Sequence, residues 1–189
     1  MTVHLSRDTA PAEAAAIIVD FWFNEVGKVH WFAPRAALDR IIAERFSVLR
    51  DAVLAQGAEG WRDDPQTSLT AVIMLDQFSR NIHRGSARAF EADPLARQLT
   101  FLALSRGWDQ GMTADRRQFL LMPLMHSENL ADQERSLDEF AKLDDETLRF
   151  ARLHHDQIAR FGRFPGRNPA LGRESTAEEQ ELIDSGRTF

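Results

Sequence analysis

The chain has 189 residues, an apolar fraction of 43% and no cysteine, which excludes disulfides, thiolate nucleophiles and cysteine-ligated zinc. Its formal net charge of −6 argues against nucleic acid as a partner, because neutralising phosphates requires a basic face. The sequence shows no signal-peptide pattern and no apolar run of the roughly 18 residues that a membrane span needs, so we expect one cytoplasmic domain over residues 1–189 without a membrane partner.

The helical period dominates the sequence, and no segment alternates as a β-strand would. An apolar stripe over residues 9–24 precedes an amphipathic helix that ends at Gly57. Asp64-Pro65 and Asp93-Pro94 each place a capping aspartate before a proline at the first helical position. Residues 69–78 are apolar on nearly every side, which predicts a central, buried helix.

The second half of the chain continues this pattern. Pro123 interrupts an apolar run, and we expect a kink or break in the helix just before it. The aspartates at 144–145 begin a helix that ends at Gly162, and Ser175 and Glu178 have the spacing of a capping box for a last short helix. The sequence therefore predicts an all-α fold of about eight helices, whose short connections make neighbouring helices antiparallel.

The segment from His154 to Arg173 leaves the helical pattern at Gly162 and is rich in proline, glycine and arginine. A loop with such a specific composition usually positions side chains for a function. Guanidinium groups bind carboxylates and phosphates in a bidentate manner. The alternative is that these arginines cap helix ends or are simply solvated. We expect an anion-binding site formed by Arg80, Asn81, Arg84, Arg163, Arg167, Asn168 and Arg173.

Asp76 lies within the most apolar helix, where an unpaired carboxylate would be strongly destabilising. It therefore needs a cationic or amide partner. Arg80 lies one turn away, and we expect the segment 163–168 to contact Asp76 or the Arg80-Asn81 end of the helix. The alternatives are a purely structural ion-pair network and a carboxylate that lines a pocket.

His126 and Glu128 are candidates for general acid–base catalysis, because two groups beside a broken helix can converge on one point. Asp76 is the alternative carboxylate, and structural histidines are the alternative interpretation. His155 lies on the inner stripe of its helix, and adjacent His154 points about 100° away, so the two cannot chelate one ion. Without a zinc-binding, nucleotide-binding or serine-nucleophile motif, the sequence predicts no metal and no cofactor.

Longer motifs run through the chain, at Val19–Phe23, Leu75–Phe90, Pro123–Glu134, Arg160–Asn168, Leu171–Thr176 and Gly186–Phe189. In residues and order they resemble the bacterial family catalogued as domain of unknown function 924. The resemblance implies an all-helical fold similar to tetratricopeptide-like α-α superhelices, and it implies no established activity.

Three positions depart from the pattern of that family. Ser79 stands where proline is usual, His83 where an aromatic residue is usual, and Gly166 where histidine is usual. A catalytic role for the family's loop histidine could not operate at Gly166, which weakens the enzyme interpretation more than the anion-binding one.

Three classes of function follow from the sequence. The first is a module that binds a small anion or the acidic end of a peptide. The second is a hydrolase-type enzyme that uses His126 with Glu128 or Asp76, with or without a metal. The third is a scaffold without a small-molecule ligand, and the sequence does not determine the oligomeric state.

Overall fold

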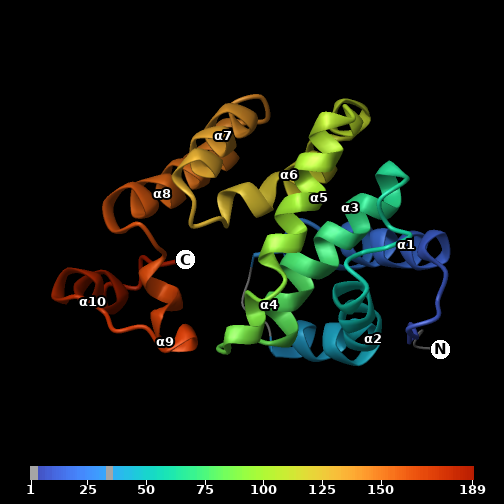
Figure 1. The fold of residues 1–189 in the computed structure, drawn as a ribbon, viewed down its shortest axis with the longest axis horizontal. Helices are drawn as coiled ribbons and strands as arrows, with labels where there is room; N and C mark the ends of the chain where they lie inside the picture. The colour runs from blue at the N-terminus through green and yellow to red at the C-terminus, as the bar shows by residue number, and fades with distance from the viewer. Residues whose placement is uncertain (1–3, 33–35) are drawn as a thin grey trace. The chain divides into compact units, whose positions relative to one another are not determined.

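The computed structural model describes residues 4–32 and 36–189, and these residues form helices with no β-strand among them, which confirms the predicted all-α class. The chain divides into two compact units (Figure 1). The N-terminal unit consists of the residues up to Arg84 together with Arg88–Gly111, and the C-terminal unit of Gly85–Ala87 and Met112–Phe189. Because the positions of the two units relative to one another are not determined, the single domain and the superhelix stay predictions.

The N-terminal unit is organised around one buried helix that corresponds to the predicted central segment. Its elements are α1 (Pro11–Asp20), η1 (Phe21–Val26), α2 (Ala36–Ala55), α3 (Pro65–Ile73), η2 (Met74–Phe78), α4 (Ser79–Ile82), α5 (Asp93–Ser105) and η4 (Trp108–Gly111), together with η3 (Ala87–Ala89) from Arg88 onward. Every residue from 67 to 79 is buried, because α3 packs against α1 and α5 while η2 packs against α2 and α5. The central position expected for residues 69–78 is therefore confirmed.

Aromatic rings form the centre of this core. The Phe78 ring stacks on Phe46 at 5.1 Å between centroids, and it meets the edges of Trp22 at 5.4 Å and Phe21 at 6.2 Å. Phe78 belongs to η2, a π-helical segment, in which the helix holds one residue more than an α-helix of the same span.

The two aspartate–proline pairs have different roles. Asp64 caps α3 as predicted, because its carboxylate accepts hydrogen bonds from the backbone N–H groups of Gln66 and Thr67. The cap predicted at Asp93 is wrong: Asp93 is the first residue of α5, and no side chain caps that helix. Its carboxylate instead accepts hydrogen bonds from two nitrogens of the Arg80 guanidinium, at 2.9 and 3.0 Å. A bidentate, charge-assisted pair is stronger than a bond to one backbone amide.

The C-terminal unit consists of three packed helices followed by short elements. These are α6 (Ala114–Met125), α7 (Leu130–Phe140), α8 (Asp145–Phe161), η5 (Pro165–Arg167), α9 (Asn168–Leu171) and α10 (Ala177–Asp184). Helix α7 packs against α6 and α8, and α10 packs against η5. Asp144 caps α8, which ends at Gly162 as predicted, because Gly162 adopts the left-handed conformation at φ 68°.

Two local predictions for this unit need correction. Helix α6 continues through Pro123 to Met125, so the break is absent and only the alternative, a kink, stays a prediction; the proline ring lacks only one hydrogen-bond donor close to the end of the helix. The capping box of α10 lies one residue later than predicted. Thr176 and Glu179 form it, with the Thr176 hydroxyl accepting from the Glu179 amide and the Glu179 carboxylate accepting from the Thr176 amide.

Among the helices that the structure describes, none combines the length and the apolar character that crossing a membrane requires.

Replacing Phe78 with alanine should lower the free energy of unfolding by about 3–5 kcal/mol, because the cavity left between three aromatic rings cannot collapse. Chemical denaturation of the purified variant measures this loss. Phe101→Ala, at a phenylalanine of the same unit that is 36% exposed, serves as the control and should change stability by less than about 1 kcal/mol. Equal losses in both variants would contradict the central position of Phe78.

Candidate functional site

The connection between α6 and α7 carries the two predicted acid–base residues, and it is rigidly held. His126 caps the C-terminus of α6, and the Asn129 side chain caps α7. The Gln133 amide donates to the backbone carbonyls of Met125 and Ser127, each at 2.7 Å. His126 and Glu128 therefore lie in a turn between α6 and α7 that these hydrogen bonds fix. The turn follows the end of α6 and is not a break within that helix.

Glu128 binds the arginine-rich segment. The two Arg173 guanidinium nitrogens donate to its two carboxylate oxygens at 2.8 Å each, and the Phe164 backbone N–H donates to one of them at 2.9 Å. Burial by itself would raise the pKa of Glu128, but these hydrogen bonds and the charge of Arg167 outweigh it, so the pKa lies below its usual value. Glu128 is consequently an ionised anchor for both ends of the loop that follows α8.

Glu179 is a second anchor for the same segment. Its carboxylate, nearly inaccessible to solvent, accepts from the Arg163 guanidinium at 2.6 and 2.7 Å and from the Asn168 amide at 3.4 Å. The hydrogen bonds from Arg163 are the main cause of its low pKa, which falls to about 2. Arg163 and Asn168, both predicted to bind an anion, therefore bind a carboxylate of the protein itself.

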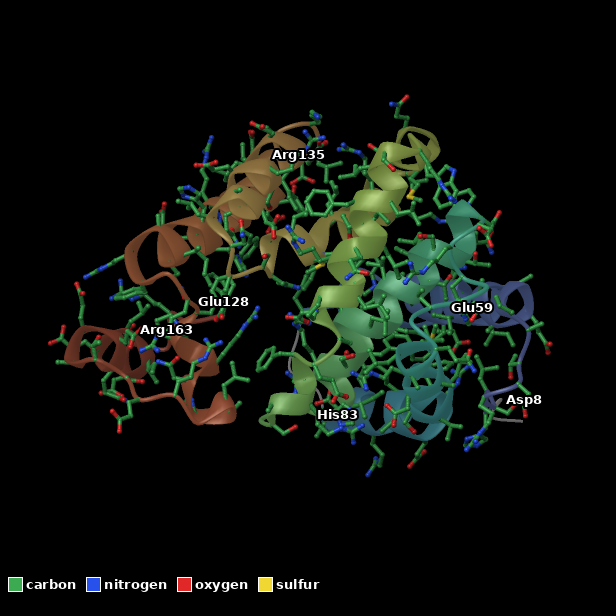
Figure 2. The ribbon with its side chains drawn as sticks, in the orientation of Figure 1. Asp8, Glu59, His83, Glu128, Arg135 and Arg163 are labelled. Atoms are coloured by element: carbon green, nitrogen blue, oxygen red, sulfur yellow. The ribbon has the colours of Figure 1, made fainter. Side chains whose placement is uncertain are left out.

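Arg167 is the most buried arginine of this segment, with 7% exposure. Its guanidinium donates to the His126 carbonyl at 2.7 Å and lies 4.5 Å from the centre of the Phe164 ring. The C-terminal unit thus brings together six predicted site residues, namely His126, Glu128, Arg163, Arg167, Asn168 and Arg173. Figure 2 shows Glu128 and Arg163 within this group.

Beside this cluster, the last residues of the chain lie against α8 and η5. The Phe189 ring stacks on the His154 imidazole with 3.7 Å between centroids, and the Gln157 amide donates to the Arg187 carbonyl at 2.9 Å. The His154 Nδ1 is 2.8 Å from the Phe150 carbonyl, which can only accept, so Nδ1 carries the hydrogen. His154, rather than His155, is the buried histidine of α8, with 6% exposure.

Gly166 completes this contact. A Cβ atom at position 166 would lie 2.8 Å from both the Phe189 carbonyl oxygen and the Thr188 Cβ, closer than real Cβ atoms approach other heavy atoms. His154, Gln157 and residues 187–189 were not predicted as site residues. The sequence carried one signal for residues 187–189, the motif at Gly186–Phe189, and the structure adds that the backbone conformation of Gly166 does not require glycine.

The N-terminal unit uses its predicted site residues in two separate ion-pair groups. Asp76 is 1% exposed and lies 3.1 Å from Arg80, which also binds Asp93. Asn81 and Arg84 both bind the Asp39 carboxylate, at 2.7 to 2.9 Å, and the hydrogen bonds from Arg84 are the main cause of the lowered pKa of Asp39. The expected contact between Asp76 and the segment 163–168 stays a prediction, because it would join the two units.

One group among the described residues has the geometry of metal ligands. Oxygens of Asp51 and Glu91 and a nitrogen of His83 all lie within 4.8 Å of one another, and Figure 2 shows where His83 lies. Arg50, which is fully buried, donates from a single nitrogen to Asp51 at 2.8 Å and to Glu91 at 2.7 Å. A cation would meet the charge of this guanidinium, so the group is better described as an arginine held by two carboxylates.

The N-terminal unit also contains an open cavity of about 340 Å³ that sequence patterns did not indicate. Its buried floor is apolar, and exposed Asp8 and Glu59, both labelled in Figure 2, lie at its rim. The lining residues are Arg7, Asp8, Thr9, Ala10, Pro11, Leu49, Ala52, Val53, Gln56, Glu59, Gly60 and Trp61. Charges of both signs surround it, and no cluster of predicted site residues opens into it.

Glu179→Gln should lower the melting temperature at pH 7 by a few degrees, on the order of 3–6 °C, because Arg163 loses its charged partner. A carboxyl whose pKa falls from 4.5 to about 2 on folding stabilises the protein above pH 4.5, and this contribution disappears as the pH drops to 2. The difference between parent and variant, measured by thermal unfolding, should therefore shrink over that range. Glu178→Gln, in an exposed pair with Arg160, is the control and should change the melting temperature little.

The family model described as "Bacterial protein of unknown function (DUF924)" matches residues 18–187. The structure of a protein of unknown function from Agrobacterium tumefaciens is similar, with 40% sequence identity, a TM-score of 0.88, and coverage of 93% of this chain and 99% of that chain. No curated protein matches the sequence. The chain therefore belongs to the bacterial family of unknown function DUF924.

Proposed function

We propose that this protein is a binding module whose C-terminal unit takes an extended peptide segment with an acidic end. The binding surface is formed by His154, Gln157, Phe164 and Gly166, and we call it the peptide seat. The observation that carries the proposal is that residues 187–189 of the chain already lie on this surface.

The contacts in the seat are those by which proteins recognise extended peptides. A side-chain amide binds a main-chain carbonyl, an aromatic side chain stacks on a ring, and a bare glycine admits the peptide backbone at close range. Main-chain contacts supply affinity with little dependence on sequence, and the ring stack supplies selectivity. The seat therefore favours a peptide with an aromatic residue at the position of Phe189.

The charge around the seat favours a negatively charged ligand. Arg163, Arg167 and Arg173 lie on the segment that forms one side of it, and Arg167 contacts the Phe164 ring. These arginines are already paired with protein acceptors, so their role in binding is to attract and orient an acidic peptide end from the rim. Arg80, Asn81 and Arg84 belong instead to ion pairs with Asp93 and Asp39, which supports a structural role for them.

The hydrolase alternative has less support. General base catalysis by His126 would need a carboxylate that orients the imidazole, yet both Glu128 oxygens bind Arg173 and one also binds the Phe164 amide. The Asp76 carboxylate in turn lies beside Arg80 within the N-terminal unit. Both carboxylates have the geometry of structural anchors.

The test uses the chain shortened to end at Gly186 and a fluorescein-labelled synthetic peptide with the sequence of residues 182–189. We expect binding with a Kd on the order of 100 μM, measured by fluorescence anisotropy, which is ordinary for a short peptide that makes few contacts. His154→Ala in the shortened chain should weaken binding about three- to tenfold, because the ring stack is lost.

His155→Ala is the matched control, since His155 is adjacent on α8 but outside the seat, and it should leave the affinity unchanged. A peptide with an amidated end should bind more weakly than one with a free carboxylate if the arginines attract the acidic end. Competition by phosphate or citrate alone would indicate a small-anion site instead. No binding of any peptide to the folded, shortened chain would contradict the proposed function.

A further inference from the structure

We infer that residues 187–189 are a built-in competitor that holds the peptide seat closed, and that the bare backbone of Gly166 makes this closure possible. The inference rests on the proposed function, since it names the regulation of the same site. It depends on three observations, which concern the contacts of the segment, the identity of residue 166 and the length of the connection to α10.

The segment 187–189 contacts three of the four residues that form the seat. The Arg187 carbonyl accepts from Gln157, Thr188 packs against Gly166, and the Phe189 ring covers the His154 imidazole. Another peptide cannot stack on His154 or bind Gln157 while these contacts are present. The segment and an external peptide are therefore mutually exclusive ligands.

Gly166 is explained by this contact alone. Its backbone lies outside the left-handed region, so an alanine could adopt the same conformation without strain. An alanine at position 166 would clash with residues 187–189 in the seat, because its Cβ would lie 2.8 Å from the Phe189 main-chain oxygen and 2.9 Å from the Thr188 hydroxyl. The glycine thus admits the backbone of a peptide, whether it comes from the same chain or from another.

The connection to the seat is short and its origin is fixed. Helix α10 ends at Asp184 and is tied to the loop by Glu179, which binds Arg163. Only Ser185 and Gly186 separate α10 from the seated residues, and Gly186 turns the chain with φ 67°. A segment tethered this closely has an effective concentration of about a millimolar, so a free peptide of 100 μM affinity should bind the intact chain roughly tenfold more weakly.

The experiment compares four proteins with the labelled peptide of residues 182–189: the intact chain, the chain ending at Gly186, and the intact chain with Gly166→Ala or Gly111→Ala. Gly111 is the matched control, because it also lies outside the left-handed region and has no atom near its missing Cβ. Two quantities are measured, the Kd by anisotropy and the NMR shifts of the His154 ring protons, which a stacked Phe189 ring displaces.

We expect the chain ending at Gly186 to bind the peptide about tenfold more tightly than the intact chain and to lose the displaced His154 signals. Gly166→Ala should also lose those signals, yet it should not gain affinity, because its Cβ excludes the external peptide as well. Gly111→Ala should behave as the intact chain in both measurements. Circular dichroism and thermal unfolding establish that each variant is folded.

Equal affinity of the intact and shortened chains would overturn the inference while leaving the proposed function standing. Unchanged His154 signals in Gly166→Ala would overturn the role of Gly166. Failure of the shortened chain to bind the peptide would overturn the proposed function and, with it, the inhibition. A displaced His154 signal in the intact chain would then identify residues 187–189 as a structural clasp only.

Discussion

The arrangement of the C-terminal unit depends on two carboxylates that bind the segment between α8 and α10. This segment buries Phe164 and Pro165 but few other apolar side chains, and outside the short elements η5 and α9 its backbone is irregular. Glu128 holds it at Phe164 and Arg173, and Glu179 holds it at Arg163 and Asn168. Ion pairs of this kind contribute little when exposed, but these carboxylates are shielded, and removing one would leave an arginine without its partner.

Ion pairs of the same kind hold arginines in place in the N-terminal unit. Arg80 pairs with Asp76 and Asp93, Arg84 pairs with Asp39, and fully buried Arg50 pairs with Asp51 and Glu91. A buried arginine is tolerated because each pair leaves one partner near water, which limits the cost of desolvation. The acidic excess of the chain is therefore spread over many such pairs, and an arginine-rich segment need not produce a basic surface.

Local features of the fold could be predicted because short-range rules determine them. The burial of residues 69–78 follows from an apolar helix on all sides, and the end of α8 follows from the left-handed Gly162. Predictions failed where two neighbouring residues satisfied the same rule. Ser175 and Thr176 can both begin a capping box, and His155 was placed on the inner stripe of α8 where the structure buries its neighbour His154. The choice between them is made by packing, which the sequence does not express.

The candidate site was predicted in part. Arg163, Asn168 and Arg173 were predicted to bind an anionic ligand, and in the structure they bind the carboxylates of Glu179 and Glu128. Pairs such as Asn81 with Asp39 join residues distant in sequence, and no local pattern indicates them. The contact of residues 187–189 with η5 was missed because it depends on an atom that is absent, the Cβ of residue 166, and their contacts with α8 join residues distant in sequence.

The π-helical segment η2 has a consequence for how this chain can change length. Because η2 accommodates one surplus residue, deleting one residue between Met74 and Phe78 would restore a regular α-helix while the turns on either side keep their faces. Arg80 and Asn81 follow directly, so their side chains would still point toward Asp93 and Asp39. A deletion beyond η2 has no surplus residue to remove and would turn the side chains that follow by about 100°. The π-helical turn is therefore the part of this helix in which the chain can lose a residue and keep its ion-pair sites.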